Sequence, residues 1–164
     1  AVELLRKLIA EQIRVYQRTN TVRAEKFSKI LANAMSNYLK GMLTNEEVIE
    51  ELLKTARAIV NGEEESKKLN LSTEELAFYD AITKPEAVQD FYTNEQLVAI
   101  TRELTDALRT NKTIDWTMKE SARAGMRRIV KRLLKKYKYP PEGQEAALET
   151  IMTQCEMWSE NEFK

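Results

Sequence analysis

The sequence contains no histidine and only one cysteine, Cys155. Histidine is the commonest general base near neutral pH and the commonest zinc ligand in proteins. Its absence excludes Ser–His–Asp and Cys–His catalytic sites, and a single cysteine leaves no residue set for a Cys/His zinc site. One cysteine cannot form an internal disulfide, so Cys155 is predicted to be a small buried apolar residue in a reducing, cytoplasmic compartment.

Glycine and proline are also scarce, with four and three residues respectively. This leaves little turn material for a fold of many short strands. With 43% hydrophobic and 32% charged residues in 164 positions, the composition is typical of one helical domain that buries a sizeable core. The chain lacks a signal segment and any apolar run near the length of a membrane span, so no membrane partner is expected. It begins at Ala1 without a methionine, which suggests a piece of a longer polypeptide.

Nucleotide-binding motifs are missing from the sequence as well. No glycine-rich segment ends in a Lys-Ser/Thr pair as in a P-loop, and no GxGxxG occurs. We therefore expect no catalytic, cofactor-binding or metal-binding residues in this chain, and no hydrolysis of ATP or DNA by it alone.

Hydrophobic spacing of 3.6 residues predicts an all-α fold, a single compact domain of about seven helices. Three capping boxes, in which a hydroxyl and a Glu or Gln side chain satisfy free N–H groups, mark helix starts at Thr44, Ser72 and Thr93. Asn61-Gly62 predicts the end of the third helix, followed by a charged loop or frayed helix end. The predicted helices span about 2–18, 22–40, 44–60, 72–82, 93–108, 115 or 117 to 139, and 141–158.

The most informative segment is residues 119–139, which hold nine Lys or Arg against one acid, although the whole chain has zero net charge. Helical spacing places an apolar face on one side and a row of cations, spaced i, i+4, that winds onto the other. The apolar face comprises Ala122, Met126, Ile129, Val130, Leu133, Leu134 and Tyr137. The row comprises Arg123, Arg127, Lys131 and Lys135.

Like charges at this spacing repel one another, so the helix needs a counter-charge. One interpretation is a track for the backbone of duplex DNA. The alternative is neutralisation by acids of the protein itself or of a partner, because residues 44–95 hold thirteen acids and five bases. The predicted DNA-binding set is Lys119, Arg123, Arg127, Arg128, Lys131, Arg132, Lys135 and Lys136.

Two aromatic residues near this helix have two interpretations each. Trp116 precedes the helix, where it could pack on the core as a hydrophobic staple or stack on a base; the staple fits its position better. Tyr139 follows the helix and could reach a phosphate.

Five segments resemble the carboxy-terminal helical domain of type I restriction enzyme motor subunits, and together they extend the match over nearly the whole chain. They are IDWTMKES at 114–121, RAGMRRIVKRLLKKY at 123–137, YPPE at 139–142, LSTEELAFYD at 71–80 and RVYQRTN at 14–20.

The resemblance implies that residues 1–164 are a helical assembly and DNA-binding domain cut from a longer subunit. It implies a parent with an endonuclease domain and two helicase-like ATPase domains, which translocates DNA with ATP and Mg²⁺. It also implies docking onto a methyltransferase core of modification and specificity subunits. The competing expectation is a purely protein-binding adaptor.

Overall fold

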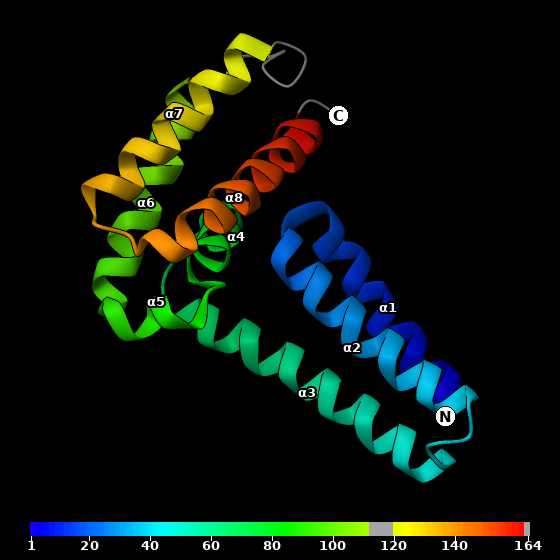
Figure 1. The fold of residues 1–164 in the computed structure, drawn as a ribbon. Helices are drawn as coiled ribbons and strands as arrows, with labels where there is room; N and C mark the ends of the chain where they lie inside the picture. The colour runs from blue at the N-terminus through cyan, green and yellow to red at the C-terminus, as the bar shows by residue number, and fades with distance from the viewer. Residues whose placement is uncertain (112–119, 163–164) are drawn as a thin grey trace. The chain divides into compact units, whose positions relative to one another are not determined.

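The structure is a computed structural model that describes residues 1–111 and 120–162, without the side chains of 86, 87 and 159–162. The all-α fold class is confirmed, with eight helices in the described ranges rather than about seven (Figure 1). None of these helices has the length and apolar character needed to cross a bilayer. The helices are α1 Val2–Thr19, α2 Thr21–Leu39, α3 Asn45–Lys68, α4 Thr73–Thr83, α5 Glu86–Phe91, α6 Asn94–Asn111, α7 Glu120–Lys136 and α8 Pro141–Glu162.

All three predicted capping boxes are present. The Glu47 amide donates to the Thr44 hydroxyl at 3.2 Å, and the Thr44 amide donates back to the Glu47 carboxylate at 3.0 Å. Ser72 with Glu75 forms the same reciprocal pair before α4. Thr93 with Gln96 forms it before α6. Each box satisfies two backbone N–H groups that the first helical turn leaves unpaired.

One predicted boundary is wrong, and one helix was not predicted. The third helix does not stop at Asn61-Gly62 but runs to Lys68, and the positive φ of Asn70 follows it. Contacts from distant segments hold this extension, because Arg23 donates to the Ser66 hydroxyl at 2.6 Å and Tyr16 hydrogen-bonds to Glu63. The missed helix is α5, which is short and begins directly after Pro85.

The described chain divides into two compact units, and each has its own core. The first unit comprises Ala1–Gln17 and Arg23–Asn70. Its core is drawn from α1, α2 and α3, and the rings of Tyr16 and Phe27 stack with their centroids 6.0 Å apart. The buried members are Ile9, Ile13, Tyr16, Ala24, Phe27, Ala34, Val48, Leu52 and Ile59.

The second unit comprises Arg18–Val22 and Leu71–Lys164, and it contains α4 to α8. Helix α6 packs against α4 and α7, and α8 packs against α4 and α7. Helices α7 and α8 lie side by side and run in opposite directions, joined by a short connection (Figure 1). Cys155 is fully buried on α8, as predicted.

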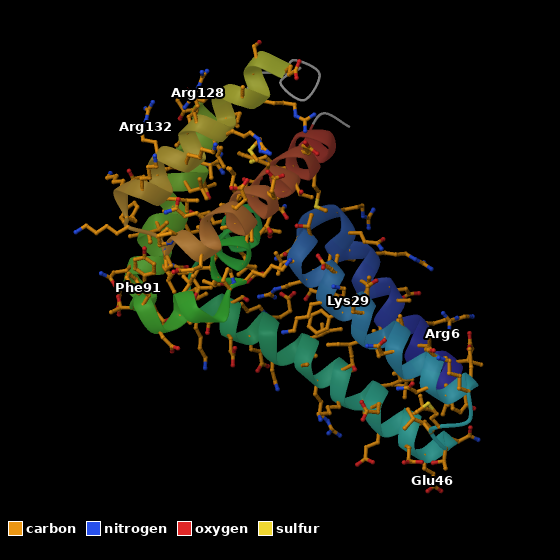
Figure 2. The ribbon with its side chains drawn as sticks, viewed as in Figure 1. Arg6, Lys29, Glu46, Phe91, Arg128 and Arg132 are labelled. Carbon is orange, nitrogen blue, oxygen red and sulfur yellow. The ribbon has the colours of Figure 1, made fainter. Side chains whose placement is uncertain are left out.

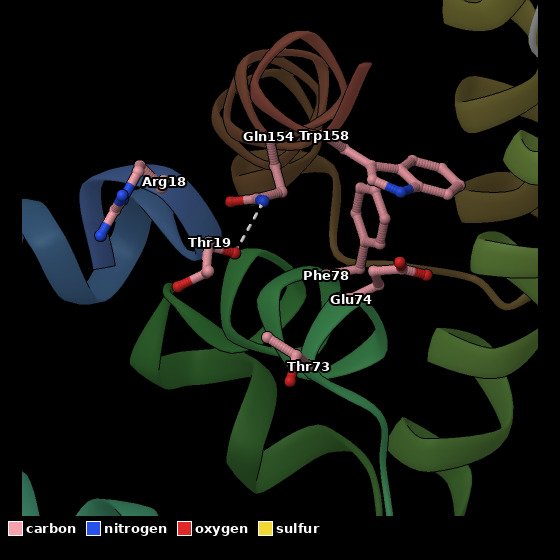
Figure 3. A pocket seen from close by; sticks show the side chains of 7 residues that line it. All are labelled: Arg18, Thr19, Thr73, Glu74, Phe78, Gln154 and Trp158. Carbon is pink, nitrogen blue, oxygen red and sulfur yellow. Dashed lines mark hydrogen bonds between the residues drawn. The ribbon is translucent and has the colours of Figure 1, made fainter. Parts of the chain in front are cut away.

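Gln154 of α8 fixes the turn between α1 and α2 within this second unit. Its side-chain amide donates to the Thr19 carbonyl at 3.1 Å, and its carbonyl accepts from the Thr21 amide at 2.9 Å. A cavity of about 240 Å³ lies beside this anchor (Figure 3). Phe78 and Trp158 meet edge to face in its wall, with centroids 5.8 Å apart.

Candidate nucleic-acid interface

Helix α7 turns one face into the core of the second unit and the other to solvent. Met126, Val130, Leu133 and Leu134 are buried, which confirms the centre of the predicted apolar face. Ala122, Ile129 and Tyr137 are only partly buried and pack against the edge of this core. Because the apolar face holds α7 in place, its cations project from a fixed support.

Tyr139 does not reach toward solvent, so the phosphate contact considered for it is wrong. The side chain is 1% exposed, and its hydroxyl donates to the Ile82 carbonyl at 2.7 Å. Burial raises the pKa of Tyr139 to about 12. Nearby, Tyr92 donates to the Tyr137 carbonyl at 2.6 Å, just beyond the end of α7. Both hydroxyls therefore satisfy carbonyls at helix ends, which the helices themselves leave unpaired.

Two arginines of the predicted track are paired with acids of α8. Arg123 Nη2 lies 2.5 Å from Glu156 Oε1. Arg127 Nη1 donates to Glu149 Oε1 at 2.8 Å. These acids were expected to come from residues 44–95, but they follow α7 in the sequence. The antiparallel packing of α7 and α8 brings them alongside.

Lys136 forms a third ion pair at the far end of α7. Its ammonium lies 2.5 Å from the Glu103 carboxylate of α6, which also accepts a hydrogen bond from the Tyr137 hydroxyl. The hydrogen bond from Lys136, followed by that from Tyr137, lowers the pKa of Glu103. The same contact raises the pKa of Lys136 and of Tyr137. This cluster ties α7 to α6, so Lys136 has a structural partner.

The remaining cations of the set that the structure describes form one solvent-facing group. Arg128, Lys131, Arg132 and Lys135 are all exposed, and none forms an ion pair with another described residue. Their spacing of i, i+3, i+4 and i+7 places them within about 100° of arc on α7. Figure 2 shows Arg128 and Arg132 pointing outward from α7 and away from α8. We call these four residues the exposed cation face.

Some predicted features lie outside the described residues. These are Lys119 of the DNA-binding set, Trp116 with its staple, and the predicted helix start at Asp115 or Thr117. Three acidic partners of the basic helix were not predicted from the sequence: Glu103, Glu149 and Glu156. One signal was available, because Glu149 and Glu156 are seven residues apart and so share a helical face.

The chemistry that this surface supports is anion binding. The four residues of the exposed cation face offer N–H donors to phosphate oxygens, and the two guanidinium groups can each donate twice in one plane. Within the described ranges no group of three His, Cys, Asp or Glu residues is placed to hold a metal ion.

Comparison with known proteins identifies the family. Residues 1–161 match the family described as type I restriction enzyme HindI endonuclease subunit-like, C-terminal. The chain is 36% identical over 160 residues to the type I restriction enzyme HindI endonuclease subunit of Haemophilus influenzae. It is 40% identical over 80 residues to the putative type I restriction enzyme MjaIXP endonuclease subunit of Methanocaldococcus jannaschii. No solved structure matches the chain.

The chain therefore belongs to the family of C-terminal domains of HindI-like type I restriction endonuclease subunits. The first match covers 98% of this chain but 15% of the Haemophilus protein. The second covers 49% of this chain and 8% of the archaeal protein. The chain thus corresponds to a small part of the relatives it matches, and the resemblance noted in the sequence is confirmed at the level of the family.

Proposed function

We propose that this chain is a non-catalytic domain that holds the backbone of duplex DNA against the exposed cation face of α7. The observation that carries the proposal is the absence of ion-pair partners, within the described chain, for four clustered cations on a helix whose other face is buried. Arg123, Arg127 and Lys136 on the same helix are paired with acids, so the exposed cation face differs from its neighbours. Contacts to phosphate carry no sequence information, so binding should be insensitive to DNA sequence.

Membership of the family extends the proposal to the parent protein. The relatives are named as endonuclease subunits of type I restriction enzymes. We propose that the domain docks its parent subunit onto a cytoplasmic methyltransferase core of modification and specificity subunits. The parent would supply ATP-dependent translocation, helicase-like activity and DNA cleavage, with ATP and Mg²⁺ bound elsewhere in its length.

The competing function is a purely protein-binding adaptor, in which an acidic partner covers the exposed cation face. DNA binding by the 164-residue chain distinguishes the two. Fluorescence anisotropy with a labelled 30-base-pair duplex would be measured from 50 to 200 mM salt. Four phosphate contacts predict that log K falls with log salt at a slope of at least about −3.6, and any further contact makes the slope steeper.

The decisive variant replaces Arg128, Lys131, Arg132 and Lys135 with glutamine. A matched control replaces Arg14, Arg57, Lys7 and Lys54, four exposed cations of the first unit that form no ion pair within the described chain. Both variants change the net charge equally. We expect DNA binding to be lost at 200 mM salt only in the first. Equal weakening in both, or no binding by the unaltered chain, would favour the adaptor, and pull-down with the methyltransferase subunits would then test it.

A further inference from the structure

Two arginines continue the exposed cation face but are held by neighbouring carboxylates. Arg123 and Arg127 belong to the same i, i+4 row as Lys131 and Lys135, with members about 6 Å apart along the axis. The first two members pair with Glu156 and Glu149 of α8. The last two form no ion pair with any described residue. Two of the four cations in this row are therefore paired with acids of α8, and the other two have no ion-pair partner among the described residues.

Both occupied pairs lie at the surface. The side chains of Arg123 and Glu156 are 49% and 35% exposed, and those of Arg127 and Glu149 are 38% and 56% exposed. Water and salt screen such pairs, which contribute little to stability. A phosphate presents oxygens to a guanidinium much as a carboxylate does. Each arginine can therefore leave its carboxylate for a phosphate at small free-energy cost.

We propose that Glu149 and Glu156 are built-in competitors that occupy Arg127 and Arg123 until a DNA backbone displaces them. Exchange would extend the phosphate contact from the four residues of the exposed cation face to six, along the full row on α7. The carboxylates would weaken binding to short or poorly placed anions, because only an extended backbone compensates for breaking both pairs. This inference rests on the proposed function and describes regulation of the same surface.

The chain offers a matched pair of variants to test the competitors. Glu149→Gln with Glu156→Gln removes both while preserving side-chain size. Glu142→Gln with Glu145→Gln changes the net charge equally at exposed positions of α8, where neither acid forms an ion pair within the described chain. We expect the first variant to bind the duplex up to about 25-fold tighter than the second, because each exposed pair is worth up to about fivefold. Equal affinities would overturn the proposal.

A second measurement tests whether the two arginines reach DNA. Arg123→Gln with Arg127→Gln should make the slope of log K against log salt shallower by about 1.8, the value for two lost phosphate contacts. If the two arginines stay paired with the carboxylates of α8 in the complex, the slope will be unchanged, and that result also overturns the proposal. The proposal requires both the tighter binding of the glutamate variant and the shallower slope of the arginine variant.

The outcomes separate this inference from the proposed function. If the four-glutamine variant of the exposed cation face loses binding while the α8 variants behave alike, the interface stands and exchange fails. If the unaltered chain shows no DNA affinity even at 50 mM salt, both fail together.

Discussion

At the scale of single residues, Tyr139 couples the end of α7 to the end of α4. Its hydroxyl donates to the carbonyl of Ile82, one residue before the last of α4. That carbonyl has no partner within its own helix, and burial leaves it no water. Removing the hydroxyl should therefore leave the buried Ile82 carbonyl without a hydrogen-bond donor. Such a loss costs about 1–3 kcal/mol.

We predict that Tyr139→Phe lowers the free energy of unfolding at pH 7 by about 1–2 kcal/mol and weakens its alkaline dependence. In the folded protein the pKa of Tyr139 is raised to about 12 from its ordinary value of 10.0, so folding favours the neutral phenol. This stabilisation is complete below about pH 10 and is lost as pH rises toward about 12. Urea melts at pH 7, 10 and 11.5 should show the two proteins converging. A constant difference would mean that Tyr139 does not titrate as described.

Burial also separates two residues that the sequence placed on the same apolar face. Leu133 is buried in the core of the second unit, whereas Ile129 is only partly buried at its edge. We predict a loss of about 2–4 kcal/mol for Leu133→Ala and a clearly smaller loss for Ile129→Ala, because the cavity left at the edge is open to solvent. Denaturant melts provide the values. Equal losses would contradict the description of this edge.

At the scale of elements, α3 contains a glycine where a helix does not need one. Gly62 lies inside α3, and a Cβ there would meet only a side-chain nitrogen of Arg23 at 3.8 Å, an ordinary contact. Gly41 has a φ of +77° in the connection after α2. Alanine suits a helical interior and is strained at positive φ.

We predict that Gly62→Ala raises the free energy of unfolding by about 0.5–1 kcal/mol. Gly41→Ala should lower it by about 1 kcal/mol, which makes it a control of opposite sign. Thermal and urea melts of both variants provide the test. If Gly62→Ala destabilises the chain, the continuous α3 is wrong and the sequence-based stop at Asn61-Gly62 is restored.

Elements defined by local chemistry could be predicted from the sequence, and elements defined by distant contacts could not. The capping boxes at Thr44, Ser72 and Thr93 involve residues three apart, so their signal is complete within four positions. The last turns of α3 depend on Arg23, which lies forty-three residues away from its partner Ser66. Helix α5 has six residues and no side-chain cap, so no local sequence pattern indicated it.

The candidate interface also has features that the local sequence predicted and features that depend on distant contacts. A period of 3.6 residues predicted which face of α7 is buried, because that pattern is contained in the helix. It could not show that Arg123 and Arg127 are paired with acids while Lys131 and Lys135 form no ion pair within the described chain. That difference depends on where α8 lies and on how its acids are spaced along it. The acids of residues 44–95 were considered as partners because of their number alone. Their positions in the fold were not known, so the predicted partners were wrong.

At the scale of the whole molecule, positive and negative charges are equal in number but are unevenly distributed along the chain. The chain has 26 basic and 26 acidic residues, yet the exposed cation face concentrates four bases on one helical surface. Four neighbouring pairs in this group are spaced i, i+3 or i, i+4, where like charges repel by a few tenths of a kcal/mol. A surface kept for binding can reduce stability in this way.

We therefore predict that replacing Arg128, Lys131, Arg132 and Lys135 with glutamine raises the free energy of unfolding by about 1 kcal/mol at 20 mM salt, through relief of that repulsion. The gain should shrink at 500 mM salt, because salt screens exposed charges within a few ångströms. Replacing Arg123 and Arg127 instead should lower stability slightly, since two ion pairs are lost. Urea melts at both salt concentrations give all four values. A clear loss of stability in the four-glutamine variant would show that these cations hold the fold together, and the interface on α7 would have to be abandoned.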